Sequence, residues 1–395
     1  MITLPLARSP RSLTILALAG LALAAFGARC PPGLDIGAYL ELRDAGVNRY
    51  VGQFHPVESE SFGDWTLHRF DPQDGEGPIC LDGTPFTVFS RVRDPKRAIV
   101  YFAGGGACWQ GMYACSARAR TTPPDPAGIF VDGFEVDGEW IENPLADWSL
   151  LYVSACDGSF FGGDNDVVDP DFSLGGVRHH RGVRNATAAL DLARQLFPGI
   201  EKVLLAGTSA GGYGVEGIIP LIARFEWLNF TRLYAFSDSG PAVFDPANVD
   251  DVRARMDDWG YARFYPSSCE ACTADRQPAE LLRWLLDRDS QIRSALYTTD
   301  ADIFVRYYLR MINQARYRAL VLDAHDPIHA ENPERHRRFI RSASEQHGVL
   351  PFDLYYSAEI EGVSLRAWLR DFVDEEPGWT DLVEDLAPVP DPWEP

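Results

Sequence analysis

From residue 97 onward, short apolar runs alternate with segments whose apolar residues recur at helical spacing. Six of the runs have the length and composition of buried strands. They cover residues 97–103, 150–154, 203–206, 233–236, 295–298 and 339–342. Residues 183–197, whose apolar side chains share one helical face, and residues 280–286 are predicted to be helices. This alternation predicts an α/β fold with a mostly parallel sheet, flanked by helices and interrupted by long loop insertions.

The remaining segments have weaker patterns. Residues 36–84 show no clear period, and we expect them to add a cap or extra edge structure to the same core. The Pro-rich residues 123–126 and the Asp- and Gly-rich residues 158–176 are predicted to be surface loops. Residues 376–395 are acidic and Pro-rich, and we expect a poorly ordered tail. The sequence therefore predicts a single domain over residues 29–375.

The first 28 residues have the layout of a signal peptide. Arg8 and Arg11 precede an apolar stretch at residues 13–26, which ends in small residues. Such a segment directs export and is removed from the mature protein, so we expect a secreted or periplasmic location. Cys30 follows closely, but Arg29 stands where a lipoprotein signal has a small residue. Lipid anchoring at Cys30 is therefore the less favoured hypothesis.

Charge and hydropathy exclude two classes of partner. The formal net charge of the 395-residue chain is −21, which argues against nucleic acid because phosphate binding needs clustered Lys and Arg. No segment has the roughly 20 apolar residues that span a bilayer, so no stable membrane insertion is expected. A hydrophobic share of 46% is enough for a sizeable core.

Export also changes the interpretation of the cysteines. In an oxidising compartment, six of the seven are expected to form disulfides. The predicted pairs are Cys108–Cys115, Cys80–Cys156 and Cys269–Cys272. The first would close a short loop, and the second would tie the segment before the first strand to the end of the second strand. The third pair also has the spacing of half a zinc site, but no second pair and no nearby histidine accompany it, so no metal site is predicted.

The most informative motif is Gly207-Thr208-Ser209-Ala210-Gly211, which follows the apolar run at 203–206 and precedes a segment of helical period. This is the strand-turn-helix setting of a nucleophile elbow, in which small flanking residues let a sharp turn expose the Ser209 hydroxyl. Pro220 indicates that the following helix is short or kinked. The motif predicts a serine hydrolase with an α/β-hydrolase-like fold.

A serine nucleophile needs a base and an acidic group that orients the base. In α/β hydrolases the chain order is serine, acid, histidine, so the base is sought after Ser209. The candidates are His325, His329, His336 and His347. His347 is favoured because it follows the last predicted strand by a short loop. His325 and His329 are expected in a solvated polar loop, and the arginines beside His336 would resist its protonation.

Two acidic residues, Asp300 and Asp302, follow the predicted strand at 295–298, and their positions leave either as the acid. An acyl-transfer serine also needs backbone N–H donors aimed at the developing oxyanion. The glycine run at 104–106 is suited to this because the backbone can approach the substrate where side chains are absent. The predicted donors are the N–H groups of Gly105, Gly106 and Ala210.

Several of these stretches resemble the motifs of the pectin acetylesterase family, which also includes the carboxylesterase Notum. Residues 103–109 are similar to its glycine-rich, cysteine-containing motif, residues 207–212 to its serine motif, and residues 238–240 to the following strand end. Residues 179–185 and 347–369 resemble stretches of bacterial members. The resemblance covers residues 78–372.

By position, this resemblance implies Ser209 as the nucleophile, His347 as the base and Asp302, rather than Asp300, as the acid. It implies a carboxylesterase that removes O-acyl groups, above all acetyl, from a polysaccharide. A Ser-His-Asp mechanism requires no metal or organic cofactor. Two departures, Ala107 for the tryptophan of plant members and Val305 for a glutamine that often follows the acid, concern the substrate and leave the chemistry intact.

Three alternatives to this prediction stay open. One is an esterase that acts on a lipid or polyester ester, since the same chemistry would hydrolyse it. The chain could also be an inactive secreted binding protein on the same fold, or a serine peptidase. The intact Ser209, His347 and Asp302 set argues against loss of activity.

Overall fold

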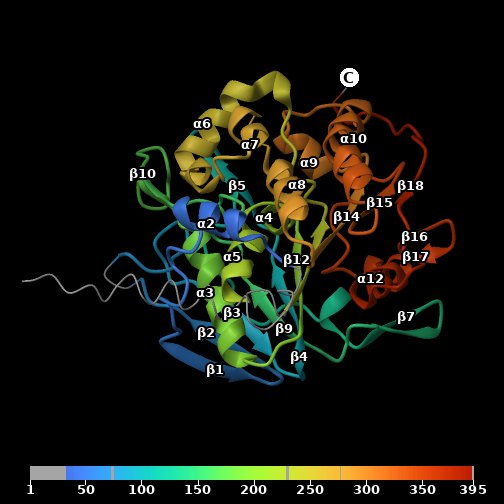
Figure 1. The fold of residues 1–395 in the computed structure, drawn as a ribbon, viewed down its shortest axis with the longest axis horizontal. Coiled ribbons are helices and arrows are strands. Elements are labelled where there is room, and N and C mark those ends of the chain that lie inside the picture. Colours follow the sequence, from blue (N-terminus) through green and yellow to red (C-terminus); the bar gives the residue numbers. More distant parts are fainter. Residues whose placement is uncertain (1–32, 73–74, 228–230, 276, 394–395) are drawn as a thin grey trace, which may run out of the picture. The chain divides into compact units, whose positions relative to one another are not determined.

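One large sheet forms the centre of the fold (Figure 1). The computed structural model describes residues 33–72, 75–227, 231–275 and 277–393. In spatial order, the sheet of this described part consists of β1 (Glu58–Phe62), β2 (Trp65–Arg69), β3 (Thr87–Arg91), β9 (Trp148–Val153), β4 (Asp94–Phe102), β12 (Lys202–Thr208), β13 (Arg232–Asp238), β14 (Ile292–Thr299), β15 (His336–Arg341) and β18 (Leu382–Val383). Neighbours from β9 to β18 pair in parallel, and β1, β2, β3 and β9 pair antiparallel. The predicted mostly parallel α/β sheet is confirmed.

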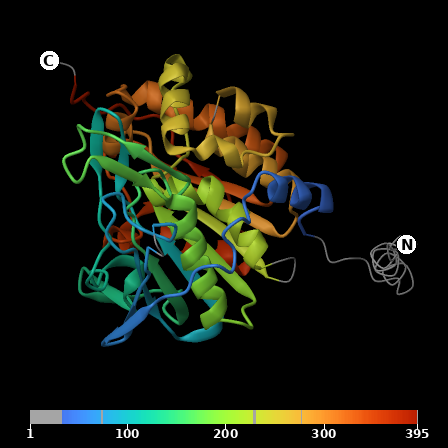
Figure 2. The same ribbon diagram turned by 90° about the vertical axis from the view of Figure 1, so that its left-hand side faces the viewer.

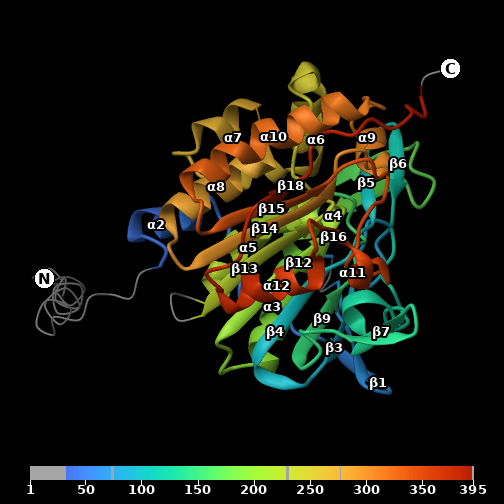
Figure 3. The same cartoon turned by 90° about the vertical axis from the view of Figure 1, so that its right-hand side faces the viewer.

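The central strands are apolar on both faces because both faces are covered. In β4, Val100 belongs to one core and Ile99 to the other, as the alternation of side chains along a strand requires. The first core is completed by α3 (Gly182–Leu196), α5 (Ile218–Glu226) and α8 (Pro278–Arg288), and the second by α12 (Leu365–Asp374). Figure 2 shows α3 and α5 in front of the sheet, and Figure 3, from the opposite side, shows α12 in front of it.

Further helices and hairpins are inserted between these elements. The helices are α2 (Ile36–Asp44), α4 (Ala210–Glu216), α6 (Val249–Trp259), α7 (Glu270–Asp275), α9 (Ile303–Tyr308), α10 (Gln314–Glu331) and α11 (Leu354–Ser357). The hairpins pair β5 (Gly106–Trp109) with β6 (Met112–Cys115), β7 (Gly133–Val136) with β8 (Glu139–Glu142), β10 (Asn165–Val168) with β11 (Val177–His180), and β16 (Glu359–Ile360) with β17 (Val363–Ser364). The hairpin β5–β6 follows directly after the first central strand and lies beside the site described below.

The predicted elements agree closely with these bounds. The six predicted strands are present as β4, β9, β12, β13, β14 and β15, and the two predicted helices as α3 and α8. The stretch 36–84, which had no clear period, contributes α2 and the edge strands β1 and β2. The Asp- and Gly-rich stretch 158–176, expected to be a loop, contains β10, which pairs with β11.

Two expectations for the C-terminal part were wrong. The polar stretch with His325 and His329 is not a loop but part of α10, because Tyr317, Val321 and Ile328 recur at helical spacing and are buried. The acidic tail is also more ordered than expected. Strand β18 pairs with β15, and the side chain of Trp379 is buried in the second core. Burial of the large Trp379 ring stabilises an ordered conformation of this polar segment.

The disulfides form as predicted, in the pairs Cys80–Cys156, Cys108–Cys115 and Cys269–Cys272. Both sulfurs of the third pair are therefore bonded to each other, which removes them as metal ligands. The predicted signal peptide at 1–28 and Cys30 lie outside the described residues. Within the described ranges, each helix is too short or too polar to cross a membrane.

Candidate active site

The candidate site lies where four parallel strands end. Because neighbouring parallel strands point the same way, the residues that follow β4, β12, β14 and β15 meet at one edge of the sheet. These are the glycine run at 104–106, Ser209, Asp302 and His347. Each predicted functional group therefore follows a different strand, and all of them lie at the same edge of the sheet.

Ser209 occupies a strained turn between β12 and α4. Its backbone has φ 57° and ψ −117°, a conformation that residues other than glycine rarely adopt. The turn depends on small neighbours, because a Cβ on Gly207 would lie 2.4 Å from the Gly211 carbonyl carbon, and a Cβ on Gly211 would lie 2.0 Å from the Phe102 carbonyl oxygen. Helix α4 ends at Glu216, and α5 starts anew two residues later, as Pro220 indicated. This is the geometry of a nucleophile elbow.

His347 is held by Asp302. The Asp302 Oδ2 atom lies 2.7 Å from His347 Nδ1, and its Oδ1 atom accepts hydrogen bonds of 3.0 Å from the N–H groups of Phe304 and Val305 at the start of α9. A carboxylate can only accept hydrogen bonds, so the contact places a proton on Nδ1 and leaves Nε2 as an acceptor. Burial disfavours the protonated ring, but the charge of Asp302 and its hydrogen bond outweigh this effect and raise the pKa of His347.

Asp300, the alternative acid, is engaged elsewhere. Its Oδ1 accepts a hydrogen bond of 2.8 Å from Gln314 Nε2, and its Oδ2 accepts bonds of 2.9 Å from Arg318 Nη1 and 2.7 Å from Ser342 Oγ. Asp300 and Asp302 are only two residues apart in sequence, but Asp302 directly precedes α9 and its side chain contacts His347. Asp302 is the N-cap of α9, which explains why its orientation is fixed.

Two residues that the sequence did not single out as functional anchor the histidine loop. Asp238, at the end of β13, accepts hydrogen bonds of 3.0 Å from the Val349 N–H and 2.9 Å from the Leu350 N–H. Ser239 Oγ accepts a hydrogen bond of 2.9 Å from the Gly348 N–H. A Cβ on Gly348 would lie 2.8 Å from Thr208 Cγ2, so this loop packs directly against the end of β12. These contacts position His347 beside Ser209.

The glycine run approaches the nucleophile closely. A Cβ on Gly104 would lie 3.2 Å from Ser209 Cβ, whereas one on Gly105 would lie 2.6 Å from Ala155 Cβ. Gly106 has φ 68° and opens the hairpin β5–β6. Side chains are thus excluded at 105 and 106 by the surrounding protein, and Gly104 is the glycine whose Cβ position faces Ser209. The roles of Gly105, Gly106 and Ala210 as oxyanion donors stay predictions.

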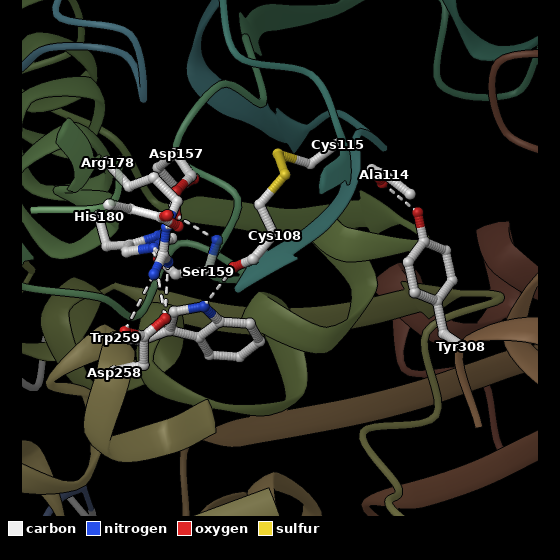
Figure 4. The surroundings of a disulfide bond; sticks show 11 residues. Cys108, Ala114, Cys115, Asp157, Ser159, Arg178, His180, Asp258, Trp259 and Tyr308 are labelled. Atoms are coloured by element: carbon white, nitrogen blue, oxygen red, sulfur yellow. Dashed lines mark hydrogen bonds and ion pairs between the residues drawn. A yellow bond between two sulfur atoms is a disulfide. The ribbon is translucent and has the colours of Figure 1, made fainter. Parts of the chain in front are cut away.

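The hairpin β5–β6 is fixed on both sides (Figure 4). The disulfide Cys108–Cys115 joins its strands. On one side, Trp259 Nε1 donates a hydrogen bond of 2.7 Å to the Cys108 carbonyl oxygen, and on the other, the Tyr308 hydroxyl donates to the Ala114 carbonyl oxygen. Because Tyr308 is the last residue of α9, which begins next to Asp302, one short helix contacts both the hairpin and the histidine partner.

Ser209 and His347 border two cavities. The larger has a volume of about 680 Å³ and is lined by aromatic side chains that include Tyr113, Phe304 and Phe352. The smaller has a volume of about 20 Å³ and lies on the Ala210 side of the nucleophile. Its wall is formed by Trp109, Phe160, Tyr213, Phe244, Arg255, Val305, Tyr308 and Leu309. The elbow therefore stands between a wide cleft and a narrow, mostly apolar cavity.

The other downstream histidines lie in a separate cluster in the core. His325 Nδ1 lies 3.2 Å from His336 Nε2, and His325 Nε2 lies 3.3 Å from Oε2 of Glu216. Burial lowers the pKa of His325 to about 4 and holds the pKa of His336 well below its ordinary value. Neither histidine lines the two cavities beside Ser209. His347 is thus the downstream histidine that the fold brings to the elbow.

The sheet and the turn at Ser209 define a class, that of the α/β-hydrolase-like folds. Solved structures of this fold are similar to the chain. Two crystal forms of the Wnt deacylase Notum from Drosophila superpose with TM-scores of 0.57 and 0.58 at 18% and 16% sequence identity. The superpositions cover 77% and 84% of this chain, and 92% and 96% of the Notum chains.

The chain also resembles a known family in sequence. Residues 61–249 match the family model described as Pectinacetylesterase. Pectin acetylesterase 11 and pectin acetylesterase 7 of Arabidopsis thaliana are 32% and 31% identical to the chain over 144 residues. These matches cover 34% of this chain and 36% of each relative, so the chain spans about a third of the length of these curated relatives. The resemblance to the pectin acetylesterase family that the motifs predicted is thus confirmed over residues 61–249.

Proposed function

We propose that the protein is an exported serine carboxylesterase that removes short O-acyl groups, above all acetyl, from a polysaccharide. The observation that carries the proposal is the 2.7 Å contact between His347 Nδ1 and Asp302 Oδ2, made by a histidine that borders the same cavities as Ser209. Similarity to the pectin acetylesterases supports ester hydrolysis as the reaction. In this proposal Ser209 is the nucleophile, His347 the base and Asp302 the acid.

In the first half of the reaction, Ser209 Oγ attacks the ester carbonyl while its proton passes to His347 Nε2. The carbonyl oxygen becomes an oxyanion, which the N–H groups of Gly105, Gly106 and Ala210 are proposed to bind. The C–O bond to the alcohol then breaks, the alcohol oxygen takes the proton from His347, and an acyl-enzyme remains. Asp302 keeps the ring in the required tautomer and stabilises the imidazolium.

In the second half, His347 takes a proton from water as the water oxygen attacks the acyl carbon. The oxyanion forms again and collapses, Ser209 Oγ leaves and recovers the proton from His347, and a carboxylic acid is released. In each half, His347 takes one proton from the attacking oxygen and gives it to the leaving oxygen. The proposed chemistry therefore uses only groups of this chain and one water molecule.

The two cavities support separate binding positions for the acyl group and the alcohol part of the substrate. The cavity of about 20 Å³ next to Ala210 has room for a group the size of one or two water molecules, which suits a methyl group and excludes a long acyl chain. The cleft of about 680 Å³ suits the alcohol part. Tyr113, Phe304 and Phe352 border this cleft with exposed rings, and aromatic faces bind the apolar faces of sugar rings well.

Labelling tests the nucleophile. A fluorophosphonate should modify the purified protein and the Ser116→Ala variant, which alters a serine of the same cleft, but not Ser209→Ala. Ser209→Ala should also abolish ester hydrolysis without loss of fold, because Ala fits a turn set by Gly207 and Gly211. An unlabelled wild-type protein would indicate an inactive binding protein, and near-normal turnover by Ser209→Ala would show that the nucleophile lies elsewhere.

A panel of substrates tests the substrate class. Acetyl, butyryl and longer esters of one alcohol should show turnover that falls steeply with chain length, since the acyl cavity is small. Acetylated polysaccharides should be deacetylated, whereas peptide amides should not be cleaved. Preference for long acyl chains would favour a lipid or polyester substrate, and cleavage of peptides would favour a peptidase.

Export is the remaining part of the proposal. It is supported by the disulfides among the described residues, which persist in oxidising compartments. Peptide mapping of the natively produced protein without reduction should recover Cys80 with Cys156 and Cys108 with Cys115. Free thiols at these four positions would contradict an exported location.

A further inference from the structure

Arg255, on α6, is a buried cation that the proposed reaction does not use. Its side chain is 7% exposed, and its guanidinium lies 3.8 Å from the ring centroid of Trp109 and 5.2 Å from that of Phe244. Its Nε atom is buried, and within the described residues no acceptor forms a hydrogen bond or ion pair with this guanidinium. A buried charged group of this kind is costly unless a partner of opposite charge binds it.

The acidic side chains around Arg255 are bound to other arginines. Asp245 Oδ1 lies 2.6 Å from Arg316 Nη2, and Asp258 Oδ2 lies 2.6 Å from Arg178 Nη1 (Figure 4). Asp251 pairs with Arg310. These three acids line the hollows next to Arg255, yet each has a cationic partner already. None of these three carboxyl groups forms an ion pair with Arg255, which leaves its guanidinium available to a ligand.

The position of Arg255 identifies what kind of ligand reaches it. It forms part of the wall of the small cavity, which it shares with Ser209, Ala210 and His347. It also lines a second hollow of about 380 Å³ on its other side, together with exposed residues such as Gln110 and Asp251. Arg255 thus separates the cavity behind the nucleophile from a second opening at the surface.

Ester hydrolysis releases an anion into this cavity. The acyl-enzyme is cleaved by water, and the resulting acid loses its proton to the solvent near neutral pH, which leaves a carboxylate. A polymeric alcohol would still fill the wide cleft on the other side of Ser209. The planar guanidinium of arginine binds a carboxylate with two parallel hydrogen bonds. Burial lowers the pKa of Arg255 to about 10, so the side chain stays protonated at neutral pH.

We propose that Arg255 binds a carboxylate ion between the small cavity and the second hollow, and that this ion is the acid released from the acyl-enzyme. The origin of the ion from the acyl-enzyme rests on the proposed esterase function. The carboxylate site itself rests only on the burial of Arg255, its lack of a described partner and its position between the two cavities. A second possible source is an acyl group that carries its own carboxylate.

Acetate and acetamide provide a matched pair of probes, because they have the same shape and differ in charge. Binding is measured by inhibition of the hydrolysis of a neutral acetyl ester and by line broadening of trifluoroacetate and trifluoroacetamide in ¹⁹F spectra of Ser209→Ala, which reports binding without turnover. The wild-type protein should bind acetate about 10–100-fold more tightly than acetamide, the usual range for hydrogen bonds to a charged group.

Substitution tests the residue. Arg255→Met should weaken acetate binding about 10–100-fold and leave acetamide binding unchanged, while Arg255→Lys should give an intermediate loss because it keeps the charge but not the paired geometry. Arg253→Met, on an exposed position of the same helix, is the control and should bind acetate as the wild type does. The comparison of acetate with acetamide in the wild-type protein needs no variant. It therefore tests for carboxylate binding even if Arg255→Met does not fold.

Two results would overturn the proposal: acetate that binds no better than acetamide, or Arg255→Met that binds acetate as tightly as the wild type. The source of the carboxylate is tested with ethyl acetate and monoethyl malonate. Faster turnover of monoethyl malonate that is lost in Arg255→Met would assign the site to the acyl group, and inhibition by acetate alone would assign it to the product. If Ser209→Ala binds acetate while the wild type hydrolyses no ester, the carboxylate site stands and the esterase proposal fails.

Discussion

Two regions of this molecule place a histidine next to an acid, and the two pairs behave in opposite ways. At the sheet edge, His347 contacts Asp302, and this contact raises the pKa of His347. In the core, His325 lies 3.3 Å from Glu216, yet its pKa is lowered to about 4. Proximity to a carboxyl group therefore does not by itself make a histidine basic.

The difference lies in the state of the acid. Two backbone N–H groups at the start of α9 donate hydrogen bonds to Asp302, and the charge of Asp302 raises the pKa of His347. Glu216 is fully buried, and burial raises its pKa well above the ordinary value, so it stays protonated and offers His325 no negative charge. A carboxyl group next to a histidine therefore raises the pKa of the histidine at His347 but not at His325. Helix capping by Asp302 is thus part of the proposed active site.

Removal of each histidine in turn should separate the roles of His347 and His325. His347→Ala should lower kcat/KM for an acetyl ester by about 10⁴-fold or more, because members of a catalytic triad act as a unit. His325→Ala should instead reduce the free energy of unfolding by about 2–5 kcal/mol, since it leaves a cavity and unpaired polar atoms in the core. Initial rates and urea titrations of both variants check this. Loss of activity in folded His325→Ala would contradict the assignment of the base.

Substitution of the two aspartates before α9 tests which of them acts on His347. Asp302→Asn should lower kcat by about 10⁴-fold, because an amide does not enforce the tautomer that leaves Nε2 free. Asp300→Asn should keep its activity and lose about 1–3 kcal/mol of unfolding free energy through weaker contacts with Arg318 and Ser342. Steady-state rates and thermal unfolding of the pair separate these effects. The reverse outcome would make Asp300 the acid.

Much of the site could be predicted from sequence because its pieces are local. The elbow requires glycines on both sides of Ser209, and each chemical group follows an apolar run that is easily recognised as a strand. Spacing could not separate Asp300 from Asp302, since both follow β14. The choice depends on which of them caps α9, and a cap is defined by backbone angles that a sequence pattern does not specify.

Long-range packing explains the expectations that failed. The polar residues around His325 obscured a helix whose buried face becomes apparent only when α10 packs against the sheet. The space next to Gly105 is also set by long-range packing, because Ala155 fills it. A bulky residue at 105 would therefore disturb the fold as well as the site, and Gly104→Ala is the cleaner probe of the space beside Ser209.

The pH dependence of the rate reports on His347 without removing it. His347 must be neutral to accept a proton, so kcat/KM should fall on the acid side with a midpoint above the ordinary histidine pKa of 6.5. Asp302→Asn should move the residual activity to a lower midpoint, because the charge that raises the pKa is gone. Rates between pH 5 and pH 9 measure both midpoints. A midpoint that does not move would show that another group sets the acid limb.

Stability should respond to pH through the buried pair. The folded-state pKa of His325 is about 4 and its ordinary value is 6.5, so between these values the unfolded chain binds more protons than the folded one. The free energy of unfolding should therefore fall as the pH drops from 6.5 to 4. His325→Gln should remove about 2–4 kcal/mol of this decrease. Urea titrations across this range check it, and equal slopes in both proteins would refute the assignment.

The smallest expected effects come from the serine beside each histidine. Ser239 Oγ accepts a hydrogen bond of 2.9 Å from Gly348 N–H, next to His347, and Ser294 Oγ lies 2.6 Å from His336 Nδ1 in the buried cluster. Ser239→Ala should lower kcat about 3–10-fold, because a base held less firmly spends less time in line with the nucleophile. The stability of this variant should change little.

Ser294→Ala should have the complementary result: unchanged kcat and a loss of about 1 kcal/mol in the free energy of unfolding, the usual value of one hydrogen bond. Steady-state kinetics and urea titrations of the two variants make a matched experiment, since each removes one hydroxyl next to one histidine. If Ser239→Ala were as active as the wild type while Ser294→Ala were slowed, the loop after β15 would not be positioned by β13. The distinction between a catalytic and a structural histidine region would then have to rest on Asp302 alone.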